Sequence, residues 1–157
     1  MGVGKTFAEA FVKSQLAASV KLPTKGRAFI SVRNADKQKI AEIGAQLLAM
    51  GFELYATRGT AAALSADGLM VTVVNKVAEG RPHVVDMIKN NEISFIVNVV
   101  DDKRAVRDSV AIRRAALAHR VTYYTTLAGA KAACIGMQAM SELTVYDLQG
   151  LHKQLTA

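Results

Sequence analysis

The sequence predicts an α/β domain in which a parallel sheet is covered by helices on both faces. Short runs of strand-forming residues alternate along the chain with longer segments of helical periodicity. This alternation requires crossover connections, and right-handed crossovers place helices on both faces of a parallel sheet. The expected strands are 28–32, 53–56, 71–74, 95–100 and 121–124, and the expected helices between and after them are 36–50, 59–66, 83–90, 103–119 and 127–140.

The helix expected at 36–50 shows the periodicity clearly. Its apolar residues follow an i, i+3, i+7, i+8 pattern, and Gly51 comes after it as a stop signal. A small strand or turn at 144–147 and a helix near 148–155 are expected to close the chain. The apolar residues of the stripe are Ile40, Ile43, Leu47 and Leu48.

A separate amphipathic helix is expected before the first strand, near residues 5–20. A linker at 21–26 follows it, so we divide the chain into a terminal helix (1–20), a linker (21–26) and a main domain (27–157). Two interpretations are open: the helix docks onto the main domain, or it is the end of a preceding domain. Its expected apolar face consists of Phe7, Ala8, Phe11, Val12 and Leu16.

Composition limits the classes of partner. The 157 residues fit one domain, and 51% hydrophobic with 21% charged residues allow a normal core. The formal net charge of +7 favours anionic ligands or partners, but Lys and Arg are spread along the chain and Trp is absent, so nucleic acid is not expected. No apolar run is long enough to span a bilayer, so no membrane association is expected. The single cysteine, Cys134, excludes an internal disulfide, is expected to be a buried thiol and predicts a reducing, cytoplasmic setting.

The sequence contains no recognisable catalytic or metal-binding pattern. His83, His119 and His152 lie far apart, without a Cys or carboxylate at metal-ligand spacing, so neither a metal nor a cofactor is expected. Asp101 and Asp102 follow the fourth strand and could act as a base. Acids are also favoured at helix N-termini, and we prefer that interpretation.

Polar and basic residues collect instead where the expected strands end. In an open parallel sheet, ligands bind beyond the carboxyl ends of the strands, where helix N-termini offer free N–H groups. The turn at 57–60 combines two threonines with a glycine that allows close backbone approach, and lysines follow the neighbouring strands. We therefore predict an anion site at this edge, formed by Ser31, Lys37, Thr57, Gly59, Thr60, Lys76 and Asn98.

Five segments, 1–11, 26–33, 51–60, 74–83 and 123–127, resemble the C-terminal end of the carbamoyl phosphate synthetase large subunit. The most specific is the run Asn-Lys-Val-Ala-Glu-Gly-Arg-Pro-His ending at residue 83. The resemblance implies the methylglyoxal-synthase-like fold, a three-layer α/β/α structure with a five-stranded parallel sheet in the order 3-2-1-4-5. It also implies that residues 1–20 are the last helix of the preceding synthetase domain.

The resemblance further implies regulation without catalysis by this part of the chain. The family is a glutamine-hydrolysing, ATP-dependent ligase of arginine and pyrimidine biosynthesis, with a glutaminase small subunit. Its allosteric domain binds the inhibitor UMP and IMP, and ornithine activates at the boundary with the neighbouring domain. The family's nucleotide-phosphate contacts fall on Lys37, Thr57, Thr60 and Lys76, with Ser31 and Asn98 nearby, and Tyr123 and Thr125 match part of its ornithine site.

One departure and two rival functions follow from the same resemblance. After Asn98 the family carries hydroxyl residues, whereas this chain has Val99, Val100 and Asp101, so nucleotide choice and affinity are open. A methylglyoxal synthase-type phosphate lyase would have a similar phosphate site, but it carries a Gly-Gly-Asp run where this chain has Glu-Gly-Arg-Pro at 79–82. A purely structural oligomerisation module is the other alternative.

Overall fold

A computed structural model describes residues 1–101 and 103–155, and the side chains of these residues except 103–105 and 154–155. Its centre is a five-stranded sheet in the order β3-β2-β1-β4-β5, and every neighbouring pair is parallel. The predicted fold class and strand order are therefore confirmed. The strands are β1 (Gly26–Ser31), β2 (Phe52–Ala56), β3 (Val71–Val73), β4 (Phe95–Asn98) and β5 (Thr122–Tyr124).

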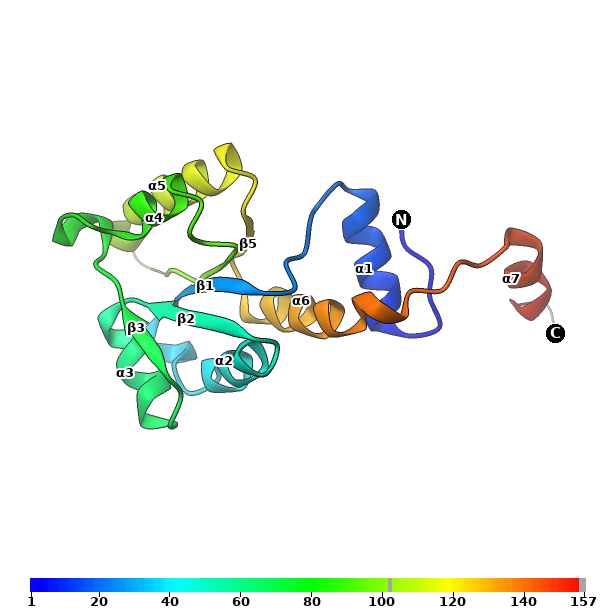
Figure 1. Cartoon of the computed structure of the whole chain (residues 1–157), viewed down its shortest axis with the longest axis horizontal. Coiled ribbons are helices and arrows are strands. Elements are labelled where there is room, and N and C mark those ends of the chain that lie inside the picture. Colours follow the sequence, from blue (N-terminus) through cyan, green and yellow to red (C-terminus); the bar gives the residue numbers. More distant parts are fainter. Residues whose placement is uncertain (102, 156–157) are drawn as a thin grey trace.

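Helices cover both faces of the sheet, which gives the three-layer architecture visible in Figure 1. One apolar core joins the sheet to α2, α3 and α6, and a second core on the opposite face joins it to α4 and α5. Phe29 lies in the second core while its neighbours Ala28 and Ile30 lie in the first, because successive side chains of a strand point to opposite faces. The helices are α1 (Phe7–Ala17), α2 (Ile40–Ala49), α3 (Arg58–Ala66), α4 (Val84–Lys89), α5 (Lys103–Ala118), α6 (Leu127–Ala139) and α7 (Leu148–Leu155), with 3-10 turns η1 (Asn34–Asp36), η2 (Val77–Glu79) and η3 (Met140–Glu142).

The elements differ from the predicted ones mainly at their ends. The helix expected at 36–50 begins only at Ile40, after the turn η1, and the strand expected to reach residue 100 ends at Asn98. Residues 144–147 form no strand. Cys134 is fully buried, as expected, and burial raises the pKa of its thiol to about 12. No helix that the structure describes is long and apolar enough to cross a membrane.

The terminal helix α1 packs on α6 and shares the first core through Val12. The buried face of α1 differs from the predicted one, because Phe7 is 64% exposed and Leu16 is 47% exposed. Because α1 packs on α6, the structure shows the first of the two open interpretations, docking of this helix onto the main domain. Whether residues 1–20 also belong to a preceding domain stays a prediction.

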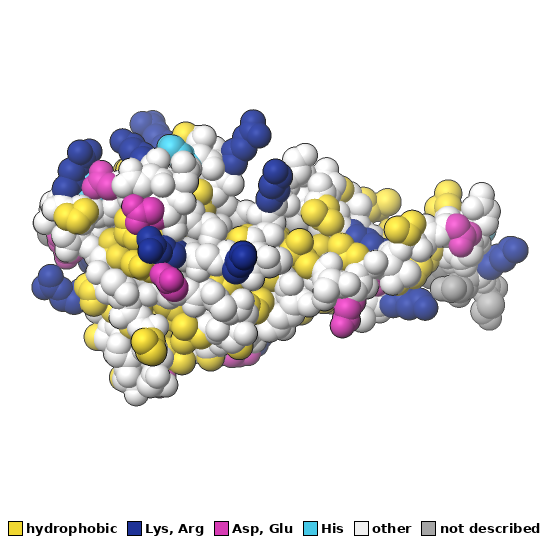
Figure 2. Space-filling view, viewed as in Figure 1, with side chains coloured by type: hydrophobic (Ala, Val, Ile, Leu, Met, Phe, Trp, Pro, Cys, Tyr) yellow, Lys and Arg dark blue, Asp and Glu magenta, His cyan; other side chains and the backbone are white. Residues whose placement is uncertain are grey.

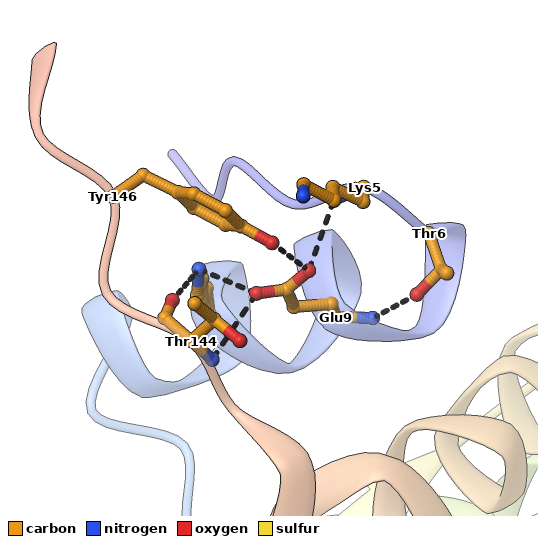
Figure 3. A network of polar contacts seen from close by, with 6 residues as sticks. Lys5, Thr6, Glu9, Thr144 and Tyr146 are labelled. Atoms are coloured by element: carbon orange, nitrogen blue, oxygen red, sulfur yellow. Dashed lines mark hydrogen bonds and ion pairs between the residues drawn. The ribbon is translucent and has the colours of Figure 1, made fainter. Parts of the chain in front are cut away.

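A polar network fixes the C-terminal segment to α1 (Figure 3). The buried carboxylate of Glu9 accepts hydrogen bonds from Lys13 Nζ (2.8 Å), Tyr146 Oη (2.8 Å), the Lys5 amide (2.9 Å) and the Thr144 amide (3.3 Å). Lys13 also donates to the Thr144 carbonyl oxygen and lies 4.2 Å from the centre of the Tyr146 ring. Residues from both ends of the chain thus complete one closed network. Beyond it, α7 projects away from the main body (Figure 1).

Candidate anion-binding site

A cavity of about 640 Å³ lies at the carboxyl edge of the sheet. Its walls come from the segments after β1, β2 and β4, from the turn η2, from the beginning of α3 and from the second and third turns of α5. The structure brings all seven predicted anion-site residues together in this cavity, although they are spread over nearly 70 positions in the sequence. They are Ser31, Lys37, Thr57, Gly59, Thr60, Lys76 and Asn98.

The beginning of α3 points free amides toward the cavity. Thr57 is the N-cap residue, and its side chain makes no capping hydrogen bond. The first amides bonded within the helix are those of Thr60 (2.9 Å) and Ala61 (2.8 Å), both to the Thr57 carbonyl oxygen. The amides of Arg58 and Gly59 precede them, and such N-terminal amides with the helix dipole favour an anion.

Gly59 provides space for the ammonium group of Lys37. A Cβ atom added at Gly59 would lie 2.8 Å from Lys37 Nζ, closer than ordinary contact allows. The glycine therefore leaves room for the Lys37 ammonium group where it lies, and its φ angle, which is not in the left-handed region, gives no other reason for a glycine. A cation held over a helix N-terminus is electrostatically unfavourable unless an anion lies between them.

Three hydroxyl groups form the floor of the cavity. Thr60 Oγ1 accepts a hydrogen bond from the Val32 amide (3.1 Å), which ties α3 to the end of β1. Thr57 Oγ1 lies 3.4 Å from both Ser31 Oγ and Thr60 Oγ1. Thr60 Oγ1 is the acceptor in its contacts with the Val32 amide and Thr57 Oγ1. Its own hydroxyl proton therefore remains available to a ligand.

The cations around the cavity are not equally available. No hydrogen bond or ion pair joins the side chains of Lys37 and Lys76 to another residue that the structure describes. Arg33, at the rim, donates through Nε to the Asp36 carboxylate. That hydrogen bond raises the pKa of Arg33, and the charge of Asp101 adds to the effect. Arg107 of α5 also lines the cavity and has no ion pair among the described residues, so Lys37, Lys76 and Arg107 are the cations that an incoming anion can recruit.

The other end of the cavity was not anticipated from the sequence. Arg107, Asp108, Ser109 and Ile112 line it from α5, and Val77 and Ala78 line it from η2. Ser109 accepts a hydrogen bond from Asn98 Nδ2 (3.2 Å). An i, i+1, i+2 run of polar residues on a helix carries no distinctive spacing, so only the packing of α5 against β4 and β5 revealed these residues.

The departure from the family's hydroxyl residues also lies in the cavity. Val100 and Asp101 both line it, and Asp101 is exposed. Asp101 is close enough to Arg33 to influence the pKa of that guanidinium, so part of its charge is offset. Asp102 and the side chain of Lys103 lie outside the described residues.

The two residues expected in an ornithine site are not in the cavity. Tyr123 is partly buried against the second core, and Thr125 is exposed at the end of the edge strand β5. Between them, Tyr124 donates from its hydroxyl to Gln15 Oε1 on α1 (3.3 Å). Tyr124 therefore lies beside the terminal helix, whereas the side chain of Tyr123 faces the second core on the other side of the sheet, and all three residues lie apart from the cavity.

The three histidines are not grouped with other potential metal ligands in the part of the chain that the structure describes. His83 is the N-cap residue of α4, and it is buried rather than solvated. Its backbone amide donates to Asp86 Oδ2 (3.1 Å), which caps the helix. Among the described residues, no group of three His, Cys, Asp or Glu side chains could hold a metal ion.

Comparison with known proteins agrees with this architecture. The carbamoyl phosphate synthase large chain of Ralstonia nicotianae is 54% identical over 156 residues, which cover 99% of this chain and 14% of that protein. The corresponding large chains of Xanthomonas axonopodis pv. citri and Pseudomonas aeruginosa are each 52% identical over 157 residues, all of this chain and 14% and 15% of theirs. The chain therefore spans about one seventh of the length of these relatives. A family model described as the MGS-like domain matches residues 39–125, more than half of the chain, and the chain therefore belongs to the MGS-like domain family.

Proposed function

We propose that this chain is a regulatory domain that binds nucleoside monophosphates by their phosphate group. The observation that carries the proposal is that Lys37 and Lys76, which have no partner among the described residues, meet the open N-terminus of α3 in one cavity. Lysine side chains and the free backbone amides of a helix N-terminus both bind phosphate. The phosphate would lie against Thr57, Gly59 and Thr60.

The size and lining of the cavity support a ligand larger than phosphate. Phosphate at α3 would fill only one end of the 640 Å³. The remaining space is bordered by apolar groups of Phe29, Val84 and Ile112 and by polar groups of Asn98 and Asp108. This mixture suits a ribose and a base, and UMP and IMP are the nucleotides that we propose.

The names of the relatives suggest the larger protein in which this domain works. They are named as carbamoyl phosphate synthase large chains, and we propose that this chain works as part of such a synthase. Its partners would be the rest of a large subunit and a glutaminase small subunit, in arginine and pyrimidine biosynthesis. Catalysis would take place elsewhere in that assembly, and the effector would act from this domain.

Ornithine is proposed to bind separately, beside Tyr123 and Thr125. The end of β5 lies close to residues 1–20, because the neighbouring Tyr124 contacts Gln15, although from the face of the sheet opposite to Tyr123. Hydroxyl groups alone compensate poorly for the amines of ornithine, because an unpaired ammonium is costly to bury. We therefore expect this chain alone to bind ornithine weakly, with the acidic ligands supplied by the rest of the synthase.

A phosphate lyase remains the rival function in the same cavity. Asp101 and Asp108 are carboxylates within it, whereas the family acid of the Gly-Gly-Asp run has no counterpart in this chain. We expect no release of phosphate from dihydroxyacetone phosphate. Release that Asp101→Asn or Asp108→Asn abolishes would establish the lyase instead.

Calorimetric titration of the chain with UMP, IMP, inorganic phosphate and ornithine tests the proposal. Saturable binding of a nucleotide and competition by inorganic phosphate are the expected results. Absence of binding by all three phosphate compounds would reject the proposed function. An oligomer that forms without any effect of these ligands would favour a purely structural module.

A further inference from the structure

A buried hydrogen bond lies at the end of the cavity opposite the proposed phosphate position. Asn98 ends β4 and Ser109 lies in the second turn of α5, and both residues are 2% exposed. Asn98 Nδ2 donates to Ser109 Oγ at 3.2 Å. Both residues nevertheless line the cavity, so the pair faces whatever occupies it.

The position of Asn98 separates it from the proposed phosphate. In the sheet Ser31 of β1 is the register partner of Asn98 on one side, and β2, which leads into Thr57 and α3, pairs with the other side of β1. A ligand whose phosphate lies at α3 therefore extends across the end of β1 before it reaches Asn98. Its base, and not its phosphate, would meet the carboxamide.

A carboxamide has two different ends, and its orientation decides which end a ligand meets. Its oxygen accepts and its nitrogen donates, and a 180° rotation exchanges them with almost no change of shape. A serine inside a helix can give its own proton to the carbonyl oxygen one turn earlier, which leaves its oxygen as an acceptor. When Ser109 Oγ acts as this acceptor, it holds the nitrogen of Asn98, and the carboxamide oxygen points away from Ser109.

We infer that Ser109 is a positioning residue that fixes the orientation of the Asn98 carboxamide and thereby sets the discrimination between keto and amino bases. This inference rests on the proposed function of the cavity. A fixed carboxamide oxygen accepts from the ring N–H of uracil, whereas the ring nitrogen of cytosine at the same place has only a lone pair. Without Ser109 the carboxamide rotates and can serve either base.

The test compares affinities for UMP, CMP and inorganic phosphate in the parent chain and in Ser109→Ala. We expect the parent to prefer UMP, and Ser109→Ala to reduce the UMP/CMP affinity ratio about 5- to 10-fold, the usual effect of one lost hydrogen bond. The affinity for inorganic phosphate should not change. Ser109→Thr, which keeps the hydroxyl, should keep the ratio, and Ser65→Ala, an exposed serine of α3, is the matched control.

A double-variant cycle shows whether Ser109 acts through Asn98. In an Asn98→Ala background, Ser109→Ala should have no further effect on the ratio. Equal weakening of UMP and CMP by Ser109→Ala, or a parent that does not discriminate, would overturn the inference while phosphate still binds. Failure of phosphate and nucleotides to bind the parent would instead reject the proposed function, and the inference with it.

Discussion

Two polar clusters in this molecule contain similar groups, but in only one of them are the charged groups paired within the protein. Around Glu9, four donors from both ends of the chain converge on one carboxylate, and Lys13 is paired with it. At the cavity, Lys37 and Lys76 have no carboxylate partner among the described residues, and the amides at the start of α3 are open. The Glu9 network is closed, and the cavity is open.

The difference is the one expected between a structural site and the binding site that we propose. A buried charge whose hydrogen bonds are all made by the protein holds segments together and leaves nothing for a ligand. An arrangement of donors that lacks its acceptor is costly on its own and is completed by an anion. Charge in general does not mark the site, because Lys and Arg side chains are scattered over the face shown in Figure 2.

Removing one lysine of the cavity should produce the largest effect on ligand binding. Charge-assisted contacts contribute about 1.5–3 kcal/mol, so Lys37→Ala or Lys76→Ala should weaken binding of a nucleotide or of phosphate about 10- to 100-fold. Calorimetry measures the affinity, and Lys89→Ala, an exposed lysine of α4, serves as control. If both variants bind as the parent does, the open cluster is not the binding site.

Filling the space beside Lys37 should have a smaller effect of the same kind. In Gly59→Ala the new Cβ displaces the ammonium group of Lys37 from the start of α3. The ammonium group is the far end of a flexible chain, so we expect a severalfold loss of phosphate affinity with little loss of stability. The same change in a Lys37→Ala background should have no effect, and an equal loss there would show that Gly59 acts through another group.

Replacing the acid at the rim should tighten binding. A carboxylate at ~6 Å from a phosphate repels it by roughly 2–3 kcal/mol at an effective dielectric near 20, and exposure to water and the nearby Arg33 reduce this. We expect Asp101→Asn to increase phosphate affinity about 3-fold, and Val100→Thr with Asp101→Ser to increase it further through a new hydroxyl donor. Unchanged affinity in the double variant, with an intact fold, would show that Asp101 faces away from the ligand.

Opening the Glu9 network should change stability and leave binding unaltered. The hydrogen bond from Lys13, together with those from Tyr146 and the two amides, lowers the pKa of Glu9 from 4.5 to about 2. The ionised carboxylate therefore stabilises the fold above pH 4.5, and this contribution is lost as the pH falls toward 2. Glu9→Gln should lower the thermal midpoint at pH 6 and remove much of its decrease between pH 4.5 and 2.5, followed by circular dichroism. A change in phosphate affinity at pH 7 would contradict the separation of the two clusters.

Periodicity and local residue chemistry predicted most of the strands and of the polar residues at the carboxyl edge of the sheet. The apolar runs predicted each strand, and the glycine and threonines at 57–60 predicted a phosphate turn, because strand propensity and turn chemistry depend on neighbouring residues. The strand order came from the resemblance to a known family, because pairing of distant strands is not encoded in any single segment. The seven predicted site residues share a cavity, yet their binding of an anion stays a prediction.

The sequence by itself therefore determined the alternating elements and the residues at the ends of the strands. Only the tertiary structure decided which face of α1 is buried, because that depends on α6 and on the segment at 144–146. The same holds for Ser109, since its partner Asn98 is eleven positions away on another element. Local patterns report how a segment folds, whereas the pairing of a buried polar group depends on which distant segment lies beside it.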